Sequence, residues 1–292
     1  MLEFKSAIFI PGANEKMLSK AGGLDADLIL FDLEDSVREN QKEVARNLVA
    51  NILSESRPAG KSLGVRVNAL DSQFLSEDLR TVLPAKPDLV LLPKVVSGDD
   101  LTQVDGLMSK IEADAGIDVG STKLIILTAE TPGSLLRFES LVNVSNRLVG
   151  MTWGPEDLAG ELGASRSRNQ SGTWLPPFQL AQTLCLAKAR DLGVQALDTV
   201  MADFKDLDGL KNECMAAKEI GFTGKLAIHP SQLKVINEVF KPTEEEIEFA
   251  QRVIELFKSN THAGALQLDG AMLDIPHLRA AERLMRRIST LL

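Results

Sequence analysis

Eight short apolar segments, separated by longer amphipathic ones, are the feature that most constrains the fold of this chain. They lack the alternation of apolar and polar residues found in a strand with one solvent face, so both faces of each predicted strand are buried. Alternation of buried strands with helices over 292 residues favours an α/β TIM barrel. The predicted strands are residues 6–12, 27–35, 62–68, 88–94, 123–130, 148–157, 196–203 and 224–230.

The alternative architecture is an open doubly wound sheet. Such a sheet usually has fewer strands and a glycine-rich phosphate-binding turn after the first one. The corresponding turn here, IPGANEKM at residues 10–17, lacks that pattern. We therefore predict a TIM barrel with amphipathic helices such as 40–53, 178–193 and 208–221.

A C-terminal helical extension follows the predicted barrel. The barrel domain is expected over 1–242 and the extension over 243–292, where Thr243 and Glu246 form a capping box at the start of an amphipathic helix. A loop rich in small residues and a basic final helix complete the extension. A barrel does not need these elements, so we expect them to cover a barrel mouth or to reach a neighbouring subunit, whose active site they would cover.

Composition excludes some classes of function. The net charge of −9 provides no excess of Lys and Arg to neutralise nucleic-acid phosphates. No segment reaches the roughly 18 apolar residues of a membrane helix, and the N-terminus lacks a secretory pattern, so a soluble, cytoplasmic protein is expected. Cys185 and Cys214 lie far apart in helical patterns and are predicted to be buried free thiols.

Charged and polar side chains follow most of the predicted strands. TIM barrels place their chemistry at the carboxyl ends of strands, so these side chains should meet at one mouth. Carboxylates that meet repel one another and require a divalent cation or basic partners. Oxygen ligands without a His or Cys cluster favour Mg²⁺, or Mn²⁺, and Glu130 and Asp157 on adjacent strands fit that role. The set is Asp32, Glu34, Asp35, Arg66, Asn68, Lys94, Glu130, Glu156, Asp157, Asp203 and His229.

Each of these residues also has a purely structural interpretation. A single Glu at a strand end is more often a salt-bridge or capping residue than a metal ligand. Arg66 would then only neutralise the acidic cluster, and Lys94 would be an ion-pair partner. His229, which precedes Pro230, would be a buried histidine of the core whose ring nitrogens have hydrogen-bond partners. The prediction of a site therefore depends on several charged strand ends in one barrel.

Nine segments, in order over nearly the whole chain, resemble the citrate lyase β-subunit-like group of the HpcH/HpaI aldolase superfamily, which includes malyl-CoA and citramalyl-CoA lyases. Together they make a specific match, although each alone is weak. One departure lies in the first segment, where Asn14 and Lys16 stand in a turn that carries an earlier basic residue in several relatives. The segments are 9–17, 26–37, 65–68, 91–94, 128–133, 150–163, 197–210, 224–232 and 270–276.

The resemblance implies a TIM barrel, a Mg²⁺ site and acyl-CoA thioester substrates. It implies that Glu130 and Asp157 are metal ligands and that Arg66 is a substrate-binding and catalytic residue. Glu130, Glu156 and Asp157 are expected to contact substrate as well. Relatives approach the CoA thioester with residues at the positions of Phe9, Lys20, Ile228 and His229.

Asp274 matches a catalytic aspartate that relatives supply from the C-terminal segment of an adjacent subunit. The resemblance therefore implies a homo-oligomer, a trimer or a hexamer. The apolar neighbours Met272, Leu273 and Ile275 are expected to bury Asp274, which would favour its role as a base.

The predicted function is Mg²⁺-dependent, Claisen-type cleavage or formation of a 2-hydroxyacyl-CoA thioester. Malyl-CoA or citramalyl-CoA would give acetyl-CoA and a 2-keto acid, glyoxylate or pyruvate. These two acids differ by one methyl group, worth only about 1–3 kcal/mol in a pocket. Two alternatives remain, a citrate lyase β-like subunit acting on a carrier-bound thioester and a class I aldolase using Lys94 as its Schiff-base amine.

Overall fold

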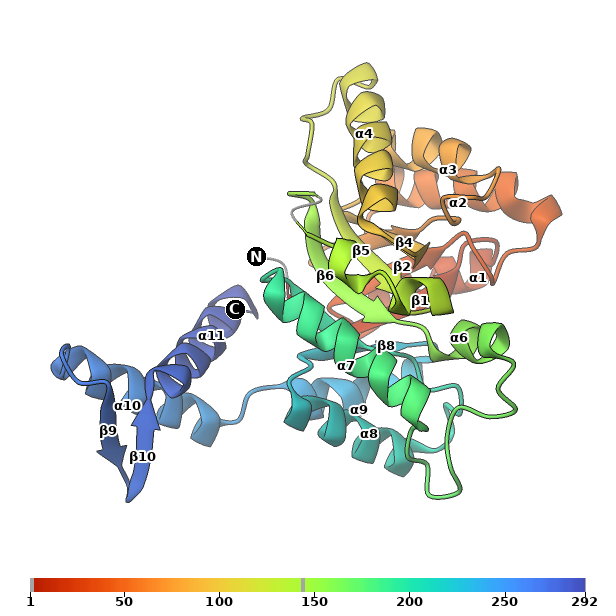
Figure 1. Ribbon diagram of the computed structural model, residues 1–292. Coiled ribbons are helices and arrows are strands. Elements are labelled where there is room, and N and C mark those ends of the chain that lie inside the picture. Colours follow the sequence, from red (N-terminus) through yellow and green to blue (C-terminus); the bar gives the residue numbers. More distant parts are fainter. Residues whose placement is uncertain (1–2, 143–144, 292) are drawn as a thin grey trace.

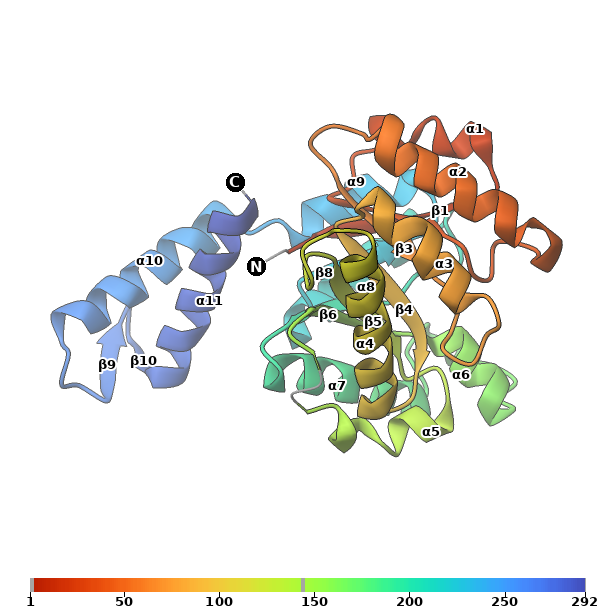
Figure 2. The ribbon, with the colours of Figure 1, turned by 90° about the horizontal axis from the view of Figure 1, so that it is seen from above.

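Eight parallel strands close into a barrel in sequence order, and helices surround it (Figures 1 and 2). The computed structural model describes residues 3–142 and 145–291. β1 pairs with both β2 and β8, which closes the sheet. The predicted TIM barrel is therefore confirmed. The strands are β1 (Ser6–Pro11), β2 (Leu28–Asp32), β3 (Ser62–Arg66), β4 (Leu89–Val95), β5 (Lys123–Thr128), β6 (Leu148–Trp153), β7 (Gln195–Asp198) and β8 (Gly224–Ala227).

All eight predicted strands are present, but the predicted extents of the sixth and seventh are wrong. The sixth was expected over 148–157, whereas β6 ends at Trp153 and Asp157 lies in the following helix. The seventh was expected over 196–203, whereas β7 ends at Asp198. The chain then leaves the barrel, and Asp203 is exposed in the following loop. The barrel helices are α1 (Glu15–Leu18), α2 (Lys42–Glu55), α3 (Leu75–Val82), α4 (Gly98–Asp114), α5 (Pro132–Leu135), α6 (Pro155–Leu162), α7 (Pro176–Asp191), α8 (Leu207–Ile220) and α9 (Pro230–Phe240).

Apolar side chains fill both the inside of the barrel and the layer between strands and helices. This double burial explains why the strand sequences do not alternate. Gly64 on β3 is required by the tight interior, because a Cβ there would lie 2.5 Å from Leu89 Cδ1 and 2.9 Å from Leu30 Cδ2. The interior cluster is Phe4, Ala7, Leu28, Leu30, Leu89, Leu91, Ile125, Leu127, Leu197 and Leu226.

The C-terminal segment forms a helix, a β-hairpin and a second helix, standing to one side of the barrel in both views (Figures 1 and 2). The prediction of a loop before the final helix is wrong, because the hairpin occupies that place. Asp269 and Gly270 both have positive φ, 50° and 83°, as a tight hairpin turn requires. The elements are α10 (Glu244–Ser259), β9 (Ala265–Leu268), β10 (Ala271–Asp274) and α11 (Ile275–Leu291).

This extension has a small apolar core of its own, and polar contacts fix it to the amino-terminal end of the barrel. The core contains Val253, Phe257 and Leu273. Arg287 donates to the carbonyl oxygens of Thr223 and Phe240, at 2.5 and 2.8 Å. Its Nε lies 3.2 Å from Glu3 Oε2. Thr223 and Glu3 precede β8 and β1, so the attachment lies opposite the carboxyl ends of the strands.

A buried ionic network ties β7 and β8 to the helices that cover them. Lys225 on β8 is fully buried, and its Nζ lies 2.7 Å from Asp198 Oδ2 and 2.6 Å from Glu213 Oε1. Trp153 Nε1 donates to the other oxygen of Asp198 at 2.9 Å. Although burial lowers the pKa of Lys225, the charges of Asp198 and Glu213 raise it above its usual value. Lys225 is therefore charged and balances the buried Asp198, and it shares Glu213 with Arg168.

The two cysteines lie close to this network. Cys185 and Cys214 are buried and free, as predicted. Burial raises the pKa of the Cys214 thiol to about 12, so it stays protonated at neutral pH. Among the described residues, no helix is long and apolar enough to cross a membrane.

Replacing Lys225 by Ala should cost about 3–5 kcal/mol of unfolding free energy, because the buried Asp198 carboxylate loses its counter-charge. Glu213 would keep its contact with Arg168. Urea unfolding followed by circular dichroism measures this loss. The matched control is Lys211→Ala at an exposed position of α8, where we expect a change within about 0.5 kcal/mol. Equal stability of the two variants would contradict the network's role.

Candidate functional site

An ion cluster at the carboxyl ends of β2 and β3 centres on Arg66. The Arg66 guanidinium binds Asp32 through two parallel contacts, Nε to Oδ1 and Nη2 to Oδ2, both 2.7 Å long. Its Nη1 lies 3.0 Å from Glu34 Oε2. The Phe9 ring on β1 lies 4.7 Å from the guanidinium carbon, a cation–π contact. Arg66 therefore has a fixed plane and a fixed position.

The next strand adds a second cation. Lys94 on β4 places its Nζ 2.7 Å from Glu34 Oε1. Although burial lowers the pKa of Lys94, the bond to Glu34 and the nearby charges of Asp35 and Asp157 raise it above its usual value. Burial raises the pKa of Glu34, while Arg66 and Lys94 counteract that effect. Arg66 and Lys94 therefore both form ion pairs with the acidic residues of this cluster.

Glu130 occupies the point where β5 ends, and two unusual backbone conformations hold it there. Ala129 and Lys94 have φ of 57° and 56°, although neither is glycine. The turn at Ala129 directs the Glu130 carboxylate toward Lys94, whose backbone N–H donates to Oε2 at 2.5 Å. Positive φ costs such residues of order 1–3 kcal/mol each. Placing this one carboxylate therefore lowers the stability of the folded state.

Burial raises the pKa of Glu130 well above its usual value, and the charges of Glu34 and Asp157 raise it further. Glu130 is 1% exposed. Its second oxygen, Oε1, accepts no hydrogen bond within the described ranges. This oxygen belongs to a buried carboxylate next to other carboxylates, which is an arrangement that a cation would relieve.

Gly154 provides the space that the Glu130 side chain occupies. A Cβ at Gly154 would lie 2.6 Å from Glu130 Cγ, closer than real Cβ contacts allow. Gly154 is also the N-cap residue of α6, and Asp157 lies in the first turn of that helix, where the dipole stabilises negative charge. The β6–α6 junction therefore both accommodates Glu130 and brings Asp157 next to it.

The structure does not bring every predicted residue into this cluster. Glu156 precedes Asp157 but is exposed. Asp203 is exposed, and its Oδ1 accepts from the backbone N–H of Lys205 at 3.0 Å. Asn68 is buried beneath the cluster. Its Nδ2 donates a hydrogen bond to Asp78, and its Oδ1 accepts one from Lys42 Nζ. Asn68 therefore supports the loop after β3.

The interpretation of His229 as a core histidine is wrong. His229 is exposed and is the N-cap residue of α9, where its Nδ1 accepts from the backbone N–H of Ser231 at 3.2 Å. Its ring stacks on Phe204 with 4.5 Å between centroids. The neighbouring Ile228 is also exposed, at 37%. An apolar and an aromatic surface therefore lie open to solvent just after β8.

Lys20 and Asp274 complete the predicted residues. Lys20 is exposed in the segment after β1. Asp274 ends β10, far along the extension, with Oδ1 2.6 Å from His277 Nδ1. Its expected burial is not found, because its side chain is 41% exposed and Met272 is 72% exposed. Since the extension attaches at the opposite end of the barrel, β10, which ends at Asp274, lies away from its own chain's mouth (Figure 1).

The donor set at the mouth consists of carboxylates. Within the described ranges, no group of three or more His, Cys, Asp or Glu residues could hold a metal ion by itself.

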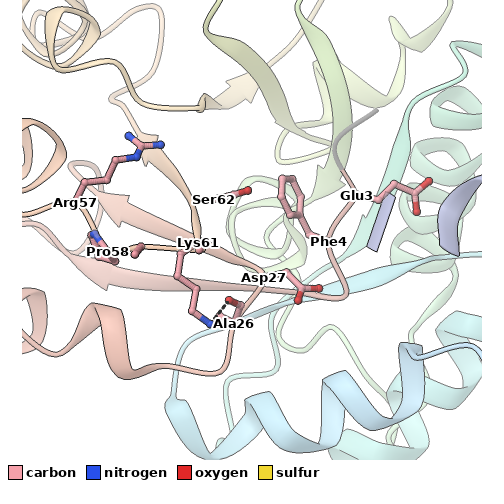
Figure 3. Close-up of a pocket in the computed structure, with 10 residues that line it drawn as sticks. Glu3, Phe4, Ala26, Asp27, Arg57, Pro58, Lys61 and Ser62 are labelled. Atoms are coloured by element: carbon pink, nitrogen blue, oxygen red, sulfur yellow. Dashed lines mark hydrogen bonds between the residues drawn. The ribbon is translucent and has the colours of Figure 1, made fainter. Parts of the chain in front are cut away.

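A cavity of about 490 Å³ lies elsewhere, at the amino-terminal end of the barrel (Figure 3). Phe4, Asp27 and Ser62 line it, and they lie at or just before the starts of β1, β2 and β3. This cavity is separate from the Glu130 cluster.

Gly154 and the backbone of Lys94 are the parts of the site that sequence reasoning missed. The Gly-Pro pair at 154–155 is a signal for the start of a helix, but it does not reveal that Glu130 needs the space. The positive φ of Lys94 has no sequence signal, because Lys is not a residue that favours this conformation.

Comparisons with known proteins agree with this architecture. Residues 5–230 match the family model described as HpcH/HpaI aldolase/citrate lyase. The citrate lyase subunit beta of Haemophilus influenzae is 35% identical over 285 residues, covering 97% of this chain and 96% of that relative. A (3S)-malyl-CoA thioesterase of Cereibacter sphaeroides is 37% identical over 290 residues, with 97% and 94% covered.

A similar solved structure is that of the protein CitE from Mycobacterium tuberculosis in complex with magnesium, acetoacetate and coenzyme A. Its TM-score is 0.76 at 29% identity, and 97% of each chain is covered. These matches confirm the family resemblance stated from the sequence. They also confirm the prediction of an enzyme, because the family consists of lyases and aldolases. The chain belongs to the HpcH/HpaI aldolase/citrate lyase family.

Proposed function

We propose that this chain cleaves or forms a carbon–carbon bond in a 2-hydroxyacyl-CoA thioester with the help of Mg²⁺. The substrate would be malyl-CoA or citramalyl-CoA, and the products acetyl-CoA and glyoxylate or pyruvate. The observation that carries the proposal is the placement of Arg66, Glu130 and Asp157 around one barrel mouth. Magnesium and coenzyme A in the complex of the Mycobacterium tuberculosis relative support it.

Glu130 and Asp157 would hold the metal ion. Two neighbouring carboxylates suit Mg²⁺, which usually takes one or two protein carboxylates and leaves its other positions to water and substrate. The free Oε1 of Glu130 fits this role, and the Lys94 N–H fixes the opposite oxygen. Mn²⁺ prefers the same oxygen donors. A bound Mg²⁺ would act as a Lewis acid on the carboxylate and adjacent oxygen of a 2-hydroxy or 2-keto acid.

Arg66 would bind the thioester oxygen. It has five N–H groups, and its hydrogen bonds to Asp32 engage two of them. Nη1 lies near Glu34 and Asp35, at 3.0 and 3.6 Å, and the N–H groups not bonded to Asp32 would serve a ligand. In the cleavage direction the carbonyl oxygen becomes an enolate oxygen, and a fixed cation there stabilises the negative charge as it develops. One such preorganised donor is worth about 3–4 kcal/mol.

The bond that breaks joins the hydroxyl-bearing carbon to the carbon next to the thioester. A base takes the hydroxyl proton, the hydroxyl carbon becomes the keto carbon of glyoxylate or pyruvate, and the bonding electrons form the enolate. Protonation of the enolate carbon then gives acetyl-CoA. Asp274 would supply that proton, and in condensation it would remove it from the acetyl methyl group.

Asp274 would act in the mouth of a neighbouring subunit, in a homotrimer or homohexamer. The attachment of the extension at the amino-terminal end of the barrel supports this arrangement, because it directs the hairpin away from its own mouth. The exposed apolar side chains of Met272 and Ile275 flank Asp274 and would be buried against that neighbour. An active unit would then need at least two chains.

The CoA portion would lie over Phe9, Lys20, Ile228 and His229. Ile228 and the stacked ring of His229 provide an exposed apolar and aromatic surface. Lys20 is exposed and free to meet a phosphate. Glu156, which is exposed at the start of α6, would lie at the edge of the substrate site.

Two related activities are distinguished by their products. Hydrolysis of the thioester would give malate and CoA, as the name of the Cereibacter sphaeroides relative indicates. Action on a carrier-bound thioester would correspond to the citrate lyase subunit of Haemophilus influenzae. The class I alternative is disfavoured, because the raised pKa of Lys94 keeps its amine protonated and Schiff-base formation needs a neutral amine.

Mass spectrometry of products tests the proposal. With malyl-CoA, methylmalyl-CoA or citramalyl-CoA and Mg²⁺, we expect acetyl-CoA or propionyl-CoA together with a 2-keto acid. EDTA should abolish turnover and excess Mg²⁺ should restore it. Turnover that EDTA leaves unchanged would contradict the metal assignment. Free CoA and malate as products would indicate hydrolysis, and turnover only with a thioester on an acyl-carrier protein would indicate a carrier-dependent subunit.

Gly154→Ala should weaken Mg²⁺ binding, because the added Cβ displaces Glu130. Loss of such a supporting contact typically costs 10–100-fold in metal affinity, and isothermal titration calorimetry measures it. The matched control is Gly160→Ala in the same helix, where a Cβ meets nothing within 4 Å. Equal Mg²⁺ affinity of the two variants would show that Glu130 does not hold the metal.

Asp274→Asn should lower kcat about 10²–10⁴-fold, the usual contribution of a general acid or base. Glu130→Gln should also be inactive. In this arrangement each site combines Glu130 of one chain with Asp274 of another. When the two inactive variants are mixed under conditions that exchange subunits, random assortment leaves both residues intact in about a quarter of the sites, so about a quarter of wild-type activity should return.

The activity of the mixture distinguishes the two locations of Asp274. No recovery, with subunit exchange verified by native mass spectrometry, would place Asp274 in its own chain's site or outside the chemistry. Unfolding midpoints of both variants close to that of the wild type would exclude misfolding as the cause of inactivity.

A further inference from the structure

A cavity of about 690 Å³ lies between the extension and the barrel, with α11 on one side and the C-terminal ends of α7 and α8 on the other. Its volume is within the range of small-molecule sites. It is distinct from the catalytic mouth, because its lining includes Glu3 and Thr223 at the amino-terminal end of the barrel. The basic residues that line it are Arg190, Lys218, Arg283, Arg286 and Arg287.

Three of these arginines come from distant parts of the chain and face the same space. Arg190 lies in the last turn of α7, while Arg283 and Arg287 lie one turn apart on α11. Burial lowers the pKa of Arg190, and the charge of Arg283 lowers it further. Burial and the charge of Arg190 likewise lower the pKa of Arg287. Arg190 is therefore repelled by both Arg283 and Arg287, and the side chains of Arg190 and Arg283 are exposed at this cavity.

Acidic groups balance this charge only in part. Glu3 lines the cavity and pairs with Arg287, and Glu246 pairs with Lys218. The C-terminal ends of α7 and α8 add about half a negative charge each. The charge of Asp27 also acts on Arg287. Even without Arg286, the residues that line the cavity include four basic side chains and one acidic one, Glu3. In the described part of the chain, Arg283 has no hydrogen bond or ion pair.

We propose that this cavity binds a small multivalent anion, a phosphate-bearing or polycarboxylate molecule, that bridges Arg283 of the extension to Arg190 of the barrel. Guanidinium groups bind both kinds of anion through paired N–H contacts. Binding would add attraction between α11 and α7 where the free protein has repulsion. The anion would thus hold the extension against the barrel, whatever the chemistry at the mouth.

Calorimetric titration of the full chain with pyrophosphate, citrate or ADP tests this. We expect saturable binding of one anion per chain for at least one of the three, weakening as ionic strength rises. The strongest binder identifies the source, with pyrophosphate or ADP favouring phosphate and citrate favouring carboxylate. Absence of saturable binding for all three would overturn the proposal.

Charge-reversal variants locate the site. Arg283→Glu should weaken binding at least tenfold, whereas Arg279→Glu, on the same helix but outside the cavity lining, should change it less than twofold. Lys20→Ala should also leave binding unchanged, which excludes an anion bound at the CoA side of the mouth. Equal affinity of the Arg283 and Arg279 variants would overturn the proposal, and thermal unfolding of each variant checks that it is folded.

Discussion

The concentration of negative charge at one end of the barrel is the constraint on which the site depends. Asp32, Glu34, Glu130 and Asp157 meet where strands end, and Arg66 and Lys94 balance only part of their charge. The bidentate Asp32–Arg66 pair is the rigid part of this balance. Glu34 links the two cations, and Glu130 is left with a raised pKa and an oxygen that accepts no hydrogen bond in the described structure.

The chain treats buried charge in two different ways. Around Lys225, two carboxylates enclose one ammonium group and every partner lies within ordinary hydrogen-bond distance, so the network has a structural role. At the mouth the contacts leave donors and acceptors unused on Arg66 and Glu130. The difference separates ions that hold the fold together from ions that are placed to meet a ligand, and it follows from hydrogen-bond partners rather than from burial alone.

Sequence reasoning was able to predict the barrel because double burial of its strands leaves a strong pattern. It also placed Glu130, Asp157, Arg66 and Lys94 at one mouth, because the carboxyl ends of parallel strands must meet there. The extent of β7 was wrong, since an apolar residue such as Met201 can lie in a loop as well as in a strand.

Tertiary features were less accessible from the sequence. The hairpin of the extension carried a usable signal, the Asp269–Gly270 pair, which the small-residue composition of that segment obscured. The exposure of His229 depends on Phe204, which is distant in sequence. The need for Gly154 depends in the same way on Glu130, and no local pattern records such a dependence.

Lys94 contributes to the mouth through two separate chemical groups, and this has a consequence for how the site tolerates change. Its backbone N–H holds Glu130, while its ammonium group holds Glu34. Any residue but proline supplies the first contact, and glycine would do so without conformational strain. The second contact needs a long cationic side chain. Substitution at this one position can therefore separate the geometry of the proposed metal ligand from the electrostatics around it, which changes at other positions would alter together.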